Sequence, residues 1–183
     1  METKNVERYL ESFGKQVVNR AKANLGKAKG GSTKLATTIK FEVKPDADGL
    51  VVKFYMADYG TFLDKGVSGN KKKQSFKNYK NQSESSPYRF GTGSSKAGKG
   101  GMSGIMTKWI KKKGFQWKDK ETGRFMSHKS MGFLVARSIY RDGIKSLSFF
   151  QKPLGLGLKQ FGKDLLGAIT IDITDKLSTI KVK

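Results

Sequence analysis

The sequence predicts an α+β fold in which an N-terminal amphipathic helix packs on a β-hairpin sheet and further helices follow a long basic insertion. Three observations predict it: an apolar stripe with helical spacing, two apolar runs that alternate like strands, and positive charge concentrated in the middle of the chain. Because 183 residues can bury one core, we expect a single domain over residues 1–183. In it, residues 66–130 form the insertion and residues 169–183 form an extended C-terminal strand or arm.

The N-terminal segment has the clearest helical pattern. Its apolar residues recur at helical intervals and therefore share one stripe: Val6, Tyr9, Leu10, Phe13, Val17, Ala21 and Leu25. Gly26 predicts the end of this helix, and residues 30–32 predict the loop that follows it.

Two alternating runs then predict a strand pair whose apolar face the first helix covers. The runs are Leu35, Thr37, Ile39, Phe41 and Val43, and then Leu50, Val52, Phe54 and Met56. Pro45 and Gly49 between them predict a hairpin loop longer than two residues. Residues 58–66 predict a short helix or turn with three apolar residues on one side, namely Tyr59, Phe62 and Leu63.

The insertion at residues 66–130 is rich in Gly, Ser and Lys and holds 16 basic against 3 acidic residues, a net of +13 out of +22 for the chain. Cations there alternate with aromatic residues, a pattern that favours contact with phosphates and bases or with an acidic protein surface. We expect the contact to involve Lys71, Lys72, Lys73, Lys77, Lys80, Arg89, Lys111, Lys112 and Lys113. The alternative is a solvated lysine-rich surface whose aromatic residues anchor the insertion to its own core or to a neighbouring subunit.

Three helices are predicted within and after the insertion. Ile105, Met106, Trp109 and Ile110 indicate a short one, and residues 120–123 a turn. The next begins at Ser127 and ends near residues 142–143. The last carries Leu154, Leu158, Phe161, Leu165 and Leu166, and the alternation of Ile169, Ile171 and Ile173 then predicts the C-terminal strand or arm.

No enzyme site is predicted. Residues 93–99 have the spacing of a phosphate-binding P-loop, but Gly100 replaces the Ser or Thr that would hold magnesium. His128 is the only histidine and is expected at a helix start, and there is no cysteine. The closest acidic residues are Asp46 with Asp48, Asp58 with Asp64, and Asp172 with Asp175, the last pair expected on an exposed segment. We therefore expect neither metal nor cofactor, and a small nuclease is the weakest of three alternatives.

No membrane contact is expected. Apolar runs of about 18 residues, which a membrane span needs, do not occur in the sequence. The first residues also lack the apolar run of a signal peptide. These patterns predict a protein that is made in the cytoplasm of the cell.

Two local motifs carry a family resemblance. One is Tyr59-Gly60-Thr61-Phe62-Leu63-Asp64-Lys65-Gly66. The other is a helix and loop, Ala136-Arg137-Ser138-Ile139-Tyr140-Arg141-Asp142-Gly143-Ile144, with the entry into the last helix, Ser148-Phe149-Phe150-Gln151-Lys152-Pro153-Leu154. Together with the long N-terminal helix and the hairpin, they resemble the neck and tail-completion proteins of tailed bacteriophages. These are small α+β proteins that form rings between the head and the tail.

The resemblance implies a structural virion protein at the head–tail junction, namely a ring-forming connector or tail-completion subunit. Its neighbours would be copies of itself, other neck, portal or tail proteins, and packaged DNA. Apolar residues beyond the needs of a small core are expected at the subunit interface: Tyr59, Phe62, Phe149, Phe150, Ile169, Ile171 and Ile173. The alternative is a monomeric basic nucleic-acid-binding protein of ribosomal or nucleoid type.

Overall fold

The computed structural model describes residues 3–29, 33–47, 49–90 and 101–179. It confirms an α+β fold with an N-terminal helix, a β-hairpin and later helices. The chain divides into two compact units. The first unit contains residues 1–65, 76–84 and 147–183, and the second unit contains residues 66–75 and 85–146. The second unit begins at Gly66, as the predicted insertion does, and continues to Ser146.

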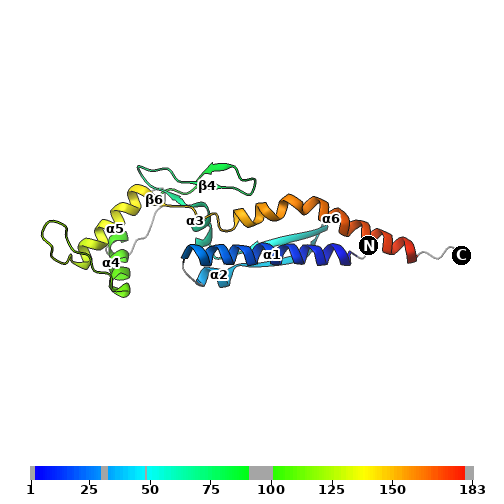
Figure 1. Cartoon of the computed structure of the whole chain (residues 1–183), viewed down its shortest axis with the longest axis horizontal. Coiled ribbons are helices and arrows are strands. Elements are labelled where there is room, and N and C mark those ends of the chain that lie inside the picture. Colours follow the sequence, from blue (N-terminus) through cyan, green and yellow to red (C-terminus); the bar gives the residue numbers. More distant parts are fainter. Residues whose placement is uncertain (1–2, 30–32, 48, 91–100, 180–183) are drawn as a thin grey trace. The chain divides into compact units, whose positions relative to one another are not determined.

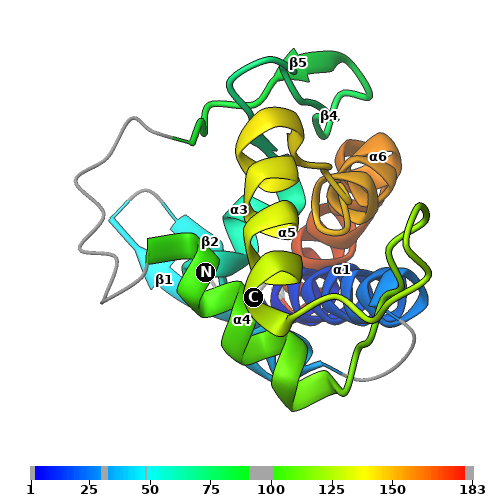
Figure 2. The same cartoon turned by 90° about the vertical axis from the view of Figure 1, so that its left-hand side faces the viewer.

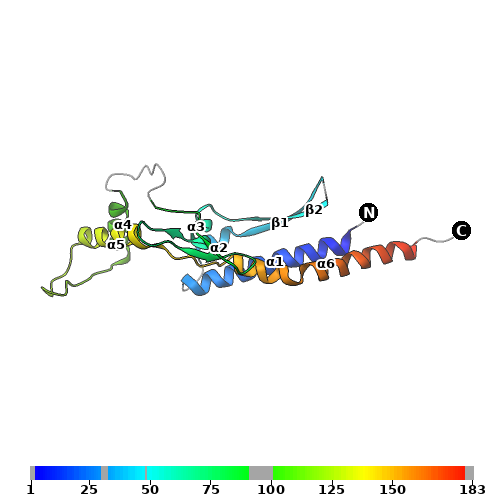
Figure 3. The same ribbon diagram turned by 90° about the horizontal axis from the view of Figure 1, so that it is seen from above.

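Two long helices form the frame of the first unit. They are α1 (Lys4–Lys29) and α6 (Gln151–Thr179), and they lie side by side (Figures 1 and 3). The prediction that Gly26 ends α1 is wrong, because Leu25 is buried in the core and Gly26 keeps a helical conformation. Residues 30–32, the predicted loop, lie outside the described residues.

The hairpin covers α1, as predicted. Strands β1 (Lys40–Asp46) and β2 (Gly49–Tyr55) are antiparallel and paired from Lys40 with Tyr55 to Asp46 with Gly49. The loop is therefore shorter than predicted, and Gly49 supports the tight turn with a φ of +132°. The core behind the hairpin is made of Phe13, Val17, Val18, Ala21, Leu25, Leu35, Ile39, Phe149 and Phe150.

Two short helices flank the hairpin. Residues 34–38 form α2 (Lys34–Thr38) instead of the start of a strand. The Thr33 hydroxyl caps this helix by accepting the N–H of Ala36, and the Thr38 hydroxyl donates to the carbonyl of Leu35. Such local bonds favour a helical turn over a strand. The short helix or turn predicted after β2 is the helix α3 (Tyr59–Lys65).

The predicted C-terminal strand is wrong, because residues 169–179 continue α6. Ile169, Ile171 and Ile173 alternate like a strand, but Ala168 and Asp172 are buried four residues apart on one helix face. That face has α1 as its neighbour, so packing on α1 selects the helical period over the alternating one. Residues 180–183 lie outside the described residues.

The second unit is built on a helix pair. The helices α4 (Gly101–Lys113) and α5 (His128–Asp142) pack side by side, as Figure 2 shows, and both were predicted. Ile110 and Met131 are fully buried between them. Gly132 permits this close packing, because a Cβ there would collide with Thr107.

Short strands complete the structure. In the second unit β3 (Val67–Ser68) pairs with β6 (Gly143–Ile144) in antiparallel fashion. A further pair joins β4 (Ser75–Lys77) to β5 (Ser83–Ser85). The predicted turn at residues 120–123 is confirmed, since Asp119 accepts the N–H groups of Glu121 and Thr122. None of the helices in the described ranges has the length and apolar composition of a membrane span.

Candidate anion-binding surface

The nine cations predicted to contact a polyanion are all exposed, but they belong to both units. Lys77 and Lys80 belong to the first unit. The second unit holds the other seven, which are Lys71, Lys72, Lys73, Arg89, Lys111, Lys112 and Lys113.

Backbone hydrogen bonds hold the first of these lysines against the end of α5. The N–H of Asn70 donates to the carbonyl of Tyr140 at 2.8 Å, and the N–H groups of Lys71 and Lys72 donate to the carbonyl of Arg141 at 3.1 and 3.2 Å. These carbonyls belong to the last turn of α5, where no helical N–H remains to pair with them. The cations therefore lie at the negative end of a helix dipole, where positive charge is favoured.

This backbone pairing creates a shallow basic concavity of about 330 Å³. Its lining contains three cations, one amide and one phenol: Asn70, Lys71, Arg137, Tyr140 and Arg141. Arg137 and Arg141 are four residues apart and so share one face of α5. We call these five residues, with Lys72 beside them, the basic surface.

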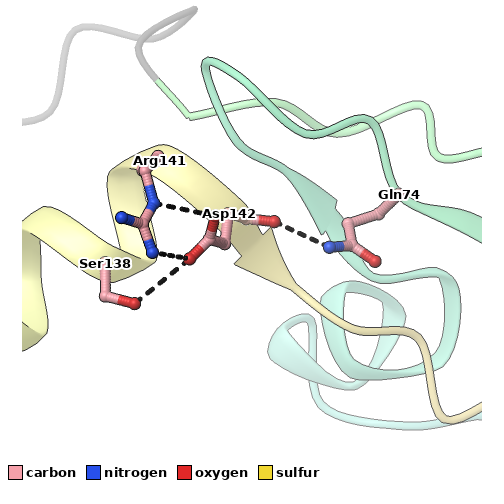
Figure 4. A network of polar contacts seen from close by, with 4 residues as sticks. All are labelled: Gln74, Ser138, Arg141 and Asp142. Carbon is pink, nitrogen blue, oxygen red and sulfur yellow. Dashed lines mark hydrogen bonds and ion pairs between the residues drawn. The ribbon is translucent and has the colours of Figure 1, made fainter.

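One carboxylate orients Arg141 of the basic surface (Figure 4). Asp142 accepts Nε of Arg141 at 3.0 Å and Nη2 at 2.7 Å, and the Ser138 hydroxyl donates to it at 3.3 Å. The Arg141 hydrogen bonds lower the pKa of Asp142, and the charges of Arg141 and Lys72 add to this effect. The Asp142 carbonyl accepts Nε2 of Gln74 at 2.7 Å (Figure 4). The four cations of the basic surface and Asp142 together carry a net charge of +3 (Lys71, Lys72, Arg137 and Arg141 against Asp142).

Aromatic rings accompany the cations in the second unit. Tyr140 is 36% exposed and packs edge-to-face with Phe90, with ring centroids 5.7 Å apart. Trp109 and Phe115, which flank Lys111–Lys113 in the sequence, pack with tilted rings whose centroids are 5.3 Å apart, and both are more than 40% exposed. Exposed rings next to cations can stack on nucleic-acid bases while the cations contact phosphates.

The described residues hold no metal site, because no group of three or more His, Cys, Asp or Glu occurs among them. Asp64 and Asp172 are buried and have structural partners, which corrects the expectation that Asp172 lies on an exposed segment. Asp64 accepts the N–H of Phe150 at 2.8 Å, and Asp172 accepts N–H groups at the start of α1. His128 begins α5, as predicted. The P-loop-like residues 93–99, together with Gly100, lie outside the described residues.

The predicted subunit-interface residues separate into two groups. Phe149 and Phe150 are 1% and 8% exposed and belong to the core of the first unit, so their assignment to an interface is wrong. The short α3 and the start of α6 bring them under the hairpin, where Phe150 packs edge-to-face on Phe54. The side chains that stay exposed are those of Tyr59, Phe62, Ile171 and Ile173, while Ile169 is half-buried.

Sequence reasoning missed four residues of the basic surface: Asn70, Arg137, Tyr140 and Arg141. The spacing of Arg137 and Arg141 was a readable signal, because residues four apart on a predicted helix share a face. The sequence could not predict that Arg137 and Arg141 lie close to Lys71, since this depends on the hydrogen bonds between residues 70–72 and the end of α5.

Comparisons with known proteins give no family assignment. No family model matches the chain. No characterised protein is significantly similar to it in sequence, and no solved structure is significantly similar to it in fold.

Proposed function

We propose that this chain is a structural virion protein, a ring-forming neck, head–tail connector or tail-completion subunit of a tailed bacteriophage. One observation supports it most directly. Leu166, Ile173 and Leu177 are 65%, 41% and 63% exposed, and their spacing of seven and four residues places them on one stripe of α6. We call these three residues the outer stripe.

The outer stripe is not needed for the core of the first unit. Phe161, Leu165 and Ala168 are less exposed and belong to the opposite, α1-facing side of the helix. An exposed apolar stripe on an otherwise packed domain is typical of a surface that another subunit covers. A subunit of a ring needs such surfaces, whereas a solitary domain does not.

The basic surface supports the second part of the proposal, which is contact with DNA or with an acidic neighbour at the head–tail junction. Its four cations, which with the neighbouring Asp142 leave a net charge of +3, attract phosphates and carboxylates alike. The proposed role is structural and requires no catalytic residue.

Light scattering coupled to size exclusion, followed by electron microscopy of the largest species, tests the ring. We expect the wild-type chain to form closed assemblies, and the triple variant L166S/I173S/L177S to lose them while keeping its circular dichroism spectrum. The matched control replaces polar residues of the same helix, as K159S/K163S/T170S. A chain that stays monomeric at every concentration, wild type and variants alike, would contradict the ring.

A second candidate function is favoured by the basic surface alone. A monomeric nucleic-acid-binding protein would use the same cations and exposed aromatic rings without the outer stripe. It predicts a monomer that binds DNA with an affinity that falls steeply with salt. Monomeric behaviour together with such binding would select this second function over the ring.

A further inference from the structure

The first unit contains a groove that the proposed function does not use. Its volume is about 750 Å³, and it is formed by the first turns of α1, the tip of the hairpin and the middle of α6. Most of its lining is apolar, namely Val6, Leu10, Pro45, Leu50, Phe161, Leu165 and Ile169. We call it the α1–α6 groove.

The charge of the groove is opposite to that of the chain. Lys and Arg make up 37 of 183 residues, yet none of the described residues that line the groove is Lys or Arg. Three carboxylates line it instead, those of Glu7, Asp46 and Asp172. An apolar groove with an acidic lining fits a segment that is both apolar and basic.

Two of these carboxylates are available to such a segment. Asp172 is committed to the N–H groups of Asn5 and Val6. Glu7 accepts only the Thr3 hydroxyl at 3.3 Å, and Asp46 accepts only the N–H of Ala47 at 2.9 Å, among the contacts between described residues. Both side chains are exposed, so an incoming cation can reach them.

The end of α6 has the matching chemistry. Beyond Asp172 the helix continues past the start of α1 (Figures 1 and 3), and Ile173 and Leu177 on it are 41% and 63% exposed. From residue 173 onward the sequence holds three Lys and one Asp: Asp175 and Lys176 belong to α6, and Lys181 and Lys183 follow its end in the sequence. Every copy of the chain therefore carries one acidic apolar groove and one apolar helix end that two lysines follow in the sequence.

We propose that the α1–α6 groove binds the end of α6 from a second copy of this chain. Ile173 and Leu177 of one copy cover the apolar lining in the other, and Glu7 and Asp46 attract the positive charge of the sequence that follows α6. The groove and the helix end are different surfaces. Each copy can therefore insert its helix end into one neighbour and bind the helix end of another neighbour in its groove, which allows a head-to-tail ring. The proposal rests on the proposed function in one respect, which is that copies of the chain associate.

Site-specific crosslinking tests the contact directly, because the full chain has no cysteine of its own. One protein carries Leu50→Cys in the groove and another carries Leu177→Cys at the helix end, so any disulfide between them joins two copies. A second groove variant, Thr3→Cys, lies at the start of α1 and removes no apolar side chain, which keeps the test valid if L50C folds poorly. The control mixes L177C with Thr37→Cys, an exposed position on α2.

We expect the L50C and L177C pair to form the mixed disulfide with a yield about tenfold or more above the T37C control, since a docked partner raises the effective thiol concentration. Adding E7K and D46K to the groove protein should lower that yield about tenfold, because like charges then face the helix end. Equal yields for groove and control pairs would overturn the proposal.

The outcomes also separate this proposal from the ring itself. Assemblies seen by light scattering without a groove-specific crosslink would overturn the groove contact and leave the ring standing. No association and no crosslink at any concentration would overturn both. Recovery of L50C crosslinked to a different basic protein, with none to L177C, would assign the groove to another partner and contradict the proposal.

Discussion

The carboxylate of Asp172 caps the helix α1 at Asn5, from 167 residues away in the sequence. It accepts the backbone N–H of Asn5 at 3.0 Å, the side-chain amide of Asn5 at 2.8 Å and the N–H of Val6 at 3.1 Å. These backbone groups belong to the first turn of α1, whose donors have no helical acceptor. One carboxylate on α6 thus acts as an N-cap for a different helix.

Replacing Asp172 by Asn should destabilise the protein at neutral pH but much less at low pH. Burial opposes ionisation of Asp172, but the hydrogen bonds from Asn5 and Val6 and the charge of Lys176 outweigh it, so the pKa is lowered. A lowered folded-state pKa contributes stability above the unfolded pKa of about 3.9, and that stability is lost as pH falls through the folded value. Urea unfolding of wild type and D172N at pH 7 and pH 3 checks this. A difference that grows toward pH 3 would contradict the assignment.

Asp64 should show the opposite pH dependence. Burial raises its pKa despite hydrogen bonds from Phe150 and Gln151. A raised folded-state pKa stabilises the protein at a pH below the unfolded value, and this contribution is lost as pH rises through the folded value. The variant D64N keeps an oxygen that can accept the N–H of Phe150. We expect the stability of D64N relative to wild type to improve as pH rises from about 4 to 7.

A second variant, D64A, leaves that buried N–H unpaired and should lower the unfolding free energy by about 1–3 kcal/mol at all these pH values. Urea unfolding of both variants across this pH range measures the two effects, and a D64N stability that falls relative to wild type as pH rises would contradict the raised pKa.

Phe149 should be essential to the core of the first unit. Its side chain is 1% exposed, so F149A leaves a cavity and should cost about 3–5 kcal/mol of unfolding free energy. Phe133, which is 55% exposed on α5, is the matched control, and F133A should change stability by less than about 1 kcal/mol. Chemical denaturation of both variants measures this. Equal losses would contradict the placement of Phe149 in the core.

Two glycines of α6 should respond to alanine with opposite signs. A Cβ at Gly155 would collide with the carbonyl of Tyr79, whereas a Cβ at Gly162 would meet nothing within 4 Å. G155A should therefore destabilise the protein by about 1–3 kcal/mol through overpacking. G162A should stabilise it by about 0.5–1 kcal/mol, because alanine is the better helix former. Thermal unfolding of the two variants tests this, and the same sign for both would contradict it.

The basic surface should account for a distinct share of polyanion binding. K71E/R137E should weaken binding to duplex DNA and lower the slope of log affinity against log salt by about 1 for each phosphate that the variant no longer neutralises. The control K159E/K163E changes the net charge equally but lies on α6 in the first unit. Fluorescence anisotropy over a range of salt concentrations measures both. Equal effects of the two double variants would mean that overall charge, and not this surface, drives binding.

The sequence predicted those helices and strands whose ends are marked by residues next to them in the chain. The helix α5 is an example, since the Ser127 hydroxyl accepts the N–H of Ser130 at its start and Gly143, with a φ of +80°, ends it. The stripe of α1 and the alternation of β1 and β2 were likewise readable, because each period marks one buried face. For the basic surface, the sequence predicted Lys71 and Lys72 but not Arg137 or Arg141.

The sequence by itself therefore determined the fold class, the positions of most helices and the concentration of positive charge, because these depend on spacing and composition within short segments. Only the tertiary structure decided three further points. It made residues 169–179 a helix, it placed Phe149 and Phe150 inside the core, and it brought Lys71 next to Arg137. Each of these depends on a partner more than 50 residues away in the chain, namely α1, the hairpin or α5. Local periodicity does not show which distant surface a segment will pack against.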